Sequence, residues 1–168
     1  MSHLRYIAHY PTQVKAQVTE LLTTERLGDW LKQRHGTPHN FRANHQLFEL
    51  GQTLKNQFLR KAPPLHHIAY SDKVLRSHDA LGVNVKKTRS HGKKQPIRRE
   101  ILVDTLFKGL SEPLLRMILA HEIAHIKEQE HNKSFYSLCC HIEPQYHQLE
   151  LELRLILVYR DYYNSLPF

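Results

Sequence analysis

The segment from Ile118 to Tyr136, ILAHEIAHIKEQEHNKSFY, contains two histidines and a glutamate at a spacing that can hold a metal ion. In an α-helix, His121 and His125 lie one turn apart on nearly the same face, so both imidazoles can reach one cation. Glu122 points about 100° to one side, where a carboxylate can take a proton from a metal-activated water without binding the metal. The spacing predicts a metal-dependent hydrolase with Glu122 as the general base.

The motif by itself is weak support for such a site, because the chain is rich in histidine. It has 14 histidines among 168 residues, and random order would produce His-Glu-x-x-His with a probability of about 7%. The prediction therefore depends on a third ligand and on the elements around the motif.

A catalytic zinc usually takes three protein ligands and leaves one position to water. His131 and Glu143 are the candidates for the third ligand, and spacing favours His131. A continuous helix would carry His131 away from the metal, so the chain must bend after Ile126, with Asn132 as a candidate αL or capping residue. Three imidazoles accept several divalent ions, so zinc is predicted and another divalent metal is left open.

Apolar residues at helical spacing place the motif in the interior of a predicted helix. Ser111 is a suitable N-cap for this helix, and Pro113 suits its first turn. Two helices are predicted within residues 1–62, the first of them in two pieces around Gly28. A long helix from about residue 145 to residue 163 ends the chain.

Between these helical regions, residues 66–106 contain short apolar runs separated by turn-forming residues. They predict three or four strands in a small antiparallel sheet with a basic loop. The predicted fold class is α+β, with N-terminal helices before the sheet and the motif helix and C-terminal helices over residues 111–168. A chain of 168 residues fits one domain over residues 1–168.

The composition suits a globular protein of a reducing compartment, since 40% of the residues are hydrophobic. The apolar runs are too short for a signal peptide or a membrane span, so we expect a cytoplasmic protein with no membrane association. Cys139 and Cys140 are neighbours on a predicted helix and do not face each other, so we expect reduced thiols. Composition leaves the oligomeric state open.

The net charge of +8 is concentrated in a basic block over residues 86–99, which contains no acidic residue. A solvated loop is one interpretation of this block, and contact with phosphate or nucleic acid is the other. The candidates for binding a substrate's phosphates are Lys87, Arg89, Lys93 and Arg98.

The run LRMILAHEIAHIKEQEHNKSFYSLCCHIEPQY resembles the signature of the YgjP-like metallopeptidase-domain family. That signature has a His-Glu-x-Ala-His helix, a further histidine six residues on, an aromatic pair and a Pro-x-Tyr. The resemblance covers nearly the whole chain, including NQFLRKAPP, which fits the bacterial members. Many members carry Trp-Gly-Ser before the motif, where this chain has Arg89-Ser90-His91-Gly92, and this departure leaves the substrate open.

The resemblance implies a zincin-like fold, with helices packed on a small sheet and a zinc ion held by three histidines. Carried over by position, the ligands are His121, His125 and His131, and the catalytic glutamate is Glu122. The resemblance strengthens His131 over Glu143 as the third ligand.

Three functions are compatible with these features. A zinc-dependent, metallopeptidase-like hydrolase would cleave a peptide, with Tyr136 near the metal and residues 100–104 as the edge strand that pairs with substrate. A metal-dependent nucleoside triphosphate pyrophosphatase would use the same metal and clamp the phosphates with basic residues. A nucleic-acid-associated binding protein or protease, similar to the SprT and WLM zincins, would use the positive charge. The expected partners are therefore a peptide or nucleotide substrate, or nucleic acid.

Overall fold

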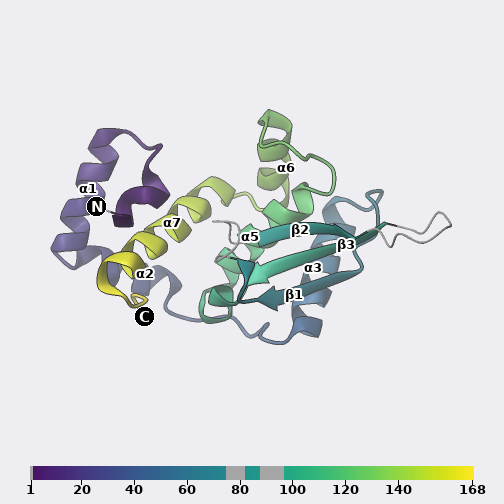
Figure 1. The fold of residues 1–168 in the computed structure, drawn as a ribbon, viewed down its shortest axis with the longest axis horizontal. Coiled ribbons are helices and arrows are strands. Elements are labelled where there is room, and N and C mark those ends of the chain that lie inside the picture. Colours follow the sequence, from purple (N-terminus) through teal and green to yellow (C-terminus); the bar gives the residue numbers. More distant parts are fainter. Residues whose placement is uncertain (1, 75–81, 88–96) are drawn as a thin grey trace. The chain divides into compact units, whose positions relative to one another are not determined.

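The computed structural model describes residues 2–74, 82–87 and 97–168, and its α+β class is the one predicted (Figure 1). The chain forms two compact units, which we call the sheet unit (His39–Tyr146) and the helical unit (Met1–Pro38 with His147–Phe168). That the whole chain is one domain stays a prediction. Among the described helices, none is long and apolar enough to cross a membrane.

The sheet unit packs helices against a three-stranded sheet. Helices α3 and α5 contact each other and lie on one face of the sheet, α3 against β1 and α5 against β2 and β3 (Figure 1). Helix α5 is buried on most of its surface, which makes it the central helix of this unit. The elements are α3 (Asn44–Phe58), β1 (His67–Ser71), β2 (Gly82–Lys87), β3 (Arg98–Asp104), the 3-10 helix η2 (Thr105–Gly109), α5 (Glu112–Ala124) and α6 (Lys133–Ile142).

The sheet is mixed, which corrects the prediction of an antiparallel sheet. Its order is β1-β3-β2, and β3 pairs antiparallel with β2 but parallel with β1. The central position gives β3, with its buried Ile101 and Val103, a hydrogen-bonded neighbour on each side. The prediction that residues 100–104 form an edge strand is therefore wrong, because this run lies in the middle of the sheet.

The helical unit contains the 3-10 helix η1 (Ser2–Ile7), α1 (Thr12–Thr23), α2 (Arg26–His35) and most of α7 (Tyr146–Tyr163). The first predicted helix does form two pieces, but it breaks before Arg26 and not at Gly28. The break falls at Glu25, whose φ of 61° is left-handed. Gly28 lies inside α2, where a Cβ atom would stand 2.8 Å from a ring carbon of Tyr159. This glycine thus allows a close approach between α2 and α7.

A buried carboxylate joins α2 to α7 within the helical unit. Glu152 is fully buried, with its oxygens 2.6 Å from His35 Nε2 and 2.7 Å from Arg34 Nη2. Gln148 donates a third hydrogen bond at 2.8 Å. Burial acts to raise the pKa of Glu152, but these hydrogen bonds outweigh burial and hold the pKa below its ordinary value.

Replacing Glu152 by glutamine is expected to lower the free energy of unfolding of the helical unit by about 2–3 kcal/mol at pH 7. A carboxylate with a lowered folded-state pKa stabilises fully above the ordinary carboxyl pKa and loses this effect as pH falls through the folded value. The difference between wild type and E152Q should therefore shrink below about pH 4. Hydrogen exchange of the α2 and α7 amides in the full chain, at neutral and acid pH, measures this difference in the free energy of unfolding.

Glu150→Gln is the matched control, because Glu150 forms a partly exposed i,i+4 pair with Arg154 on the same helix. Such pairs contribute less than about 1 kcal/mol, so E150Q should change exchange little. A difference between wild type and E152Q that is the same at both pH values would contradict the role given to the ionised carboxylate.

Candidate metal centre

Three histidine side chains converge at the C-terminal end of α5. The Nε2 atom of His125 lies 3.2 Å from that of His121 and 3.0 Å from that of His131, and the third pair is 3.4 Å apart. Ligand nitrogens bound to a tetrahedral zinc ion at about 2.0–2.1 Å would lie about 3.3 Å from one another. The three nitrogens therefore have the spacing of a metal site. Imidazole nitrogen suits zinc, copper, nickel and iron alike, so the donor set indicates a divalent metal rather than one element.

The end of α5 is what brings His131 back toward the other two histidines. The helix ends at Ala124 and His125 is its C-cap, so the motif occupies the last turn and not the helix interior that was predicted. Asn132 then caps α6, with its side-chain oxygen accepting from Phe135 N at 2.9 Å. Asn132 was predicted as a left-handed or capping residue where the motif helix ends, but its backbone is extended and it caps the start of α6, while His125 is the C-cap of α5.

Two of the histidines have their second ring nitrogen engaged. Nδ1 of His125 lies 2.9 Å from the carbonyl oxygen of Glu128, and Nδ1 of His121 lies 2.7 Å from Tyr146 Oη. A carbonyl only accepts, so Nδ1 of His125 carries the proton and leaves the Nε2 lone pair available. Burial lowers the pKa of His125, and the neighbouring His131 adds to this. Both effects favour the neutral imidazole that binds metals.

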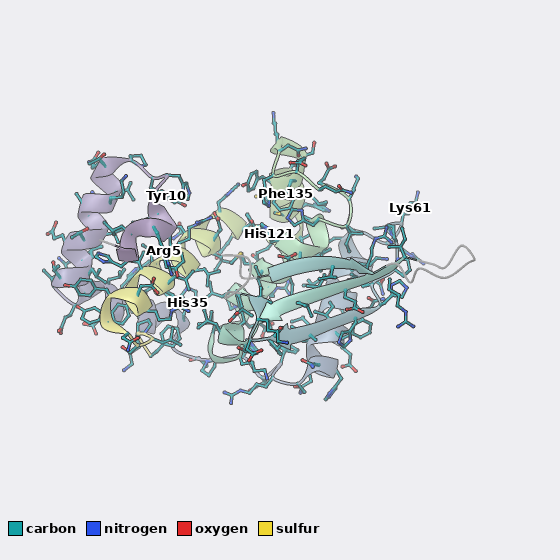
Figure 2. All side chains as sticks on the ribbon, in the orientation of Figure 1. Arg5, Tyr10, His35, Lys61, His121 and Phe135 are labelled. Atoms are coloured by element: carbon teal, nitrogen blue, oxygen red, sulfur yellow. The ribbon has the colours of Figure 1, made fainter. Side chains whose placement is uncertain are left out.

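Phe135 forms the apolar wall of the cluster from α6. Its ring is fully buried, and its centroid lies 4.9 Å, 4.5 Å and 4.8 Å from the rings of His121, His125 and His131. His121 and Phe135 accordingly lie close together in the sheet unit (Figure 2). Phe135 is therefore a core residue of the sheet unit. Such a wall lowers the local dielectric and restricts the imidazole rotamers.

Glu122 is buried beside the cluster, on the side of α5 that contacts β2. Only 2% of its surface is exposed, and burial raises its pKa to about 8. A divalent cation held by the histidines would favour the ionised carboxylate and oppose this rise. Gly82, the first residue of β2, lies so close that an added Cβ atom would collide with Glu122 Oε1. The strand backbone thus shapes the space for this carboxylate.

Replacing Gly82 by alanine is expected to lower kcat by about 100-fold with little change in metal affinity. Gly82 is paired with Val103 in the sheet, so the strand is held and the carboxylate must move. Gly109→Ala is the matched control, because nothing lies within 4 Å of a Cβ atom there. Steady-state kinetics and metal titration of both variants measure the effect. Wild-type kcat in G82A would show that the placement of this carboxylate does not limit turnover.

Of the other candidate residues, the described part of the chain places Arg98 away from the histidines and Tyr136 beside them. Arg98 is exposed and pairs in register with Lys87 at the far end of the β2–β3 hairpin from Gly82, roughly 16 Å along the strand. The side chain of Lys87, and all of Arg89 and Lys93, lie outside the described residues. Tyr136 does lie beside the cluster, with its ring centroid 6.4 Å from that of His131.

Glu143, the rival for the third ligand, is engaged elsewhere. One of its carboxylate oxygens lies 3.5 Å from Arg116 Nε, and the other accepts from Gln145 N at 3.2 Å. It caps the C-terminal end of α6 and does not join the histidine group.

Two residues of the site were not predicted from the sequence. Tyr146 is the tyrosine of the Pro-x-Tyr in the family-like signature, so the sequence marked this residue. Its hydrogen bond to His121 could not be read from the signature. No local pattern marks Gly82, because its importance depends on β2 lying against α5.

Comparison with known proteins gives two matches. A family model described as YgjP-like, metallopeptidase domain, matches residues 8–155. The chain is 48% identical over 157 residues to a UTP pyrophosphatase of Escherichia coli (strain K12), and the alignment covers 94% of each chain. No solved structure matches significantly. Together these matches indicate a metal-dependent hydrolase, as the motif predicted.

Proposed function

Because the chain belongs to the YgjP-like metallopeptidase-domain family, we propose that it releases pyrophosphate from a nucleoside triphosphate at a divalent metal. The observation that carries this proposal is the 48% identity, over 94% of both chains, to a protein named for pyrophosphate release from UTP. The sequence predicted this activity as an alternative to a peptidase, and the relative favours it.

We assign the metal to the Nε2 atoms of His121, His125 and His131, whose mutual distances of 3.0–3.4 Å suit one ion. When bound, a divalent metal supplies a Lewis acid that polarises a phosphoryl oxygen and acidifies water. The first two ligands are oriented through their Nδ1 atoms, and the wall formed by Phe135 limits ring movement. Zinc is the proposed ion.

In the proposed reaction, water attacks the α-phosphorus, and the bond from that phosphorus to the bridging oxygen of the β-phosphate breaks. Glu122 accepts the proton of the attacking water as general base, and pyrophosphate leaves with the bridging oxygen. The burial of Glu122 supports this role, because a carboxylate with a raised pKa is a stronger base near neutral pH.

Tyr136 is proposed to donate its hydroxyl to charge that develops on the reacting group, because it lies beside His131 and is partly exposed. The basic residues Lys87, Arg89, Lys93 and Arg98 are proposed phosphate or base contacts. Since Arg98 lies at the far end of the hairpin from Gly82, it would meet only a part of the substrate remote from the reacting phosphorus.

Peptide hydrolysis is the second candidate, and the position of β2 favours it. Among the described strands, β2 is an edge strand that pairs only with β3, and its first residue lies against Glu122. An extended peptide could add to such an edge and bring its carbonyl to the same metal and base. In this candidate function, β2 would be the edge strand that pairs with the peptide, which is the role predicted for residues 100–104.

The two functions are distinguished by their products. The full chain, loaded with zinc, is incubated with UTP, ATP and CTP, and separately with an unfolded protein such as casein. We expect equal amounts of nucleoside monophosphate and pyrophosphate, with no peptide fragments. Release of orthophosphate and nucleoside diphosphate, or cleavage of casein without nucleotide turnover, would overturn the proposed pyrophosphatase activity. Glu122→Gln protein serves as the control for contaminating hydrolases.

A further inference from the structure

Tyr146 lies beside the metal-site histidines, at the start of α7. Only 1% of its surface is exposed, and its hydroxyl oxygen lies 2.7 Å from Nδ1 of His121. A buried hydroxyl from another helix is thus a hydrogen-bond partner of the second ring nitrogen of His121.

The direction of these hydrogen bonds decides whether His121 can bind a metal. A neutral imidazole carries one proton, and Nε2 is free to bind only when that proton is on Nδ1. For His125 the partner of Nδ1 is a backbone carbonyl, which only accepts, so the tautomer follows at once. For His121 the partner is a hydroxyl, which can either donate or accept. Its direction must therefore be set by a third group.

The metal site on the other side of the ring sets that direction. Nε2 of His121 lies 3.2 Å and 3.4 Å from the Nε2 atoms of His125 and His131, so this nitrogen faces the cluster. A neutral histidine that binds a metal through Nε2 carries its proton on Nδ1. In that tautomer the Nδ1–H of His121 donates to the hydroxyl oxygen of Tyr146.

We propose that Tyr146 is a positioning residue for the metal site, whose hydroxyl oxygen accepts from the Nδ1–H of His121 and holds this ring in the tautomer that leaves the Nε2 lone pair to a metal. This inference rests on the metal site of the proposed function. Hydrogen-bond partners of metal-bound histidines contribute to affinity, and their removal typically costs about 10–100-fold in metal binding.

The test compares Tyr146→Phe with Tyr70→Phe in the full chain. Both changes remove one tyrosine hydroxyl from the sheet unit. The hydroxyl of Tyr70 donates to the backbone carbonyl of Phe41 at 2.6 Å, which is not part of the histidine cluster. Zinc affinity is measured by competition with a chelator. We expect Y146F to bind zinc about 10–100-fold more weakly and Y70F to bind as wild type. Equal zinc affinity in wild type and Y146F would overturn the proposal.

A second readout separates positioning from a purely structural role and does not require activity. In the metal-free chain, long-range 1H–15N correlation spectra report which ring nitrogen of His121 carries the proton. We expect Nδ1–H in wild type and in Y70F, and a shift toward Nε2–H in Y146F. An unchanged tautomer in Y146F would overturn the proposal. If wild type bound zinc and showed the Nδ1–H tautomer but released no pyrophosphate from nucleotides, the proposed function would fail while the assignment to Tyr146 stood.

Discussion

Replacing Glu122 by glutamine is expected to lower kcat by about 1,000-fold while the protein keeps its metal. Glutamine preserves the shape of the side chain but cannot accept a proton, so water attack loses its general base. Glu122 is buried beside the three histidines but is not a member of the histidine group, so metal binding should be unaffected. Pyrophosphate release from UTP, together with the metal content of the purified variant, measures both parts.

Glu143→Gln is the matched control for this prediction. Glu143 is a carboxylate of the same unit that pairs with Arg116 and caps α6 away from the cluster. E143Q should therefore keep both its metal and its turnover to within a few-fold. Undiminished turnover in E122Q would show that another group takes the proton, and loss of metal from E143Q would return Glu143 to the ligand set.

Replacing His131 by alanine is expected to weaken zinc binding by more than about 100-fold. Structural zinc sites with four ligands bind with about 10–16 kcal/mol, or roughly 3 kcal/mol for each ligand. His131 is exposed and lies in the segment between α5 and α6, so its removal should cost little folding stability. The H131A variant should therefore lose its zinc while it remains folded. Chelator competition and thermal unfolding of the same preparation separate the two effects.

His141→Ala provides the comparison, because His141 is also exposed and lies on α6 with its ring against Phe58. It should bind zinc as wild type does. If H131A retained a full equivalent of tightly bound zinc, the third ligand would have to be a different residue. Retention of metal by H131A together with its loss from H141A would identify that residue.

Several features of the fold could be predicted because they depend on nearby residues. Ser111, Pro113 and the apolar stripe after them define the start of α5, and α7 follows its own helical pattern. A bend after Ile126 was expected because a continuous helix would carry His131 away from the other two histidines, and α5 does end at Ala124. Each of these residues lies within one or two helical turns of the helix end or face that it determines. Contacts with distant segments therefore do not alter these features.

Strand order could not be predicted in the same way. The short runs that became β1, β2 and β3 were identified, but their pattern does not state which strand is central. The order follows from which strand buries its side chains between two neighbours, and this is decided by contacts between segments far apart in sequence. The error placed residues 100–104 at an edge of the sheet, where the structure has β1 and β2.

What the sequence determined by itself is a set of candidate residues: two histidines one turn apart that could bind a metal, a glutamate beside the first of them as a candidate base, and a third histidine within reach of a bend. Spacing along one helix and its cap is a local property, so these residues could be named before any fold was known. What only the tertiary structure decided is the environment that controls those residues. Gly82 against Glu122 and the hydroxyl of Tyr146 on His121 join separate elements. Such contacts exist only after distant apolar surfaces have packed together, which no local pattern records.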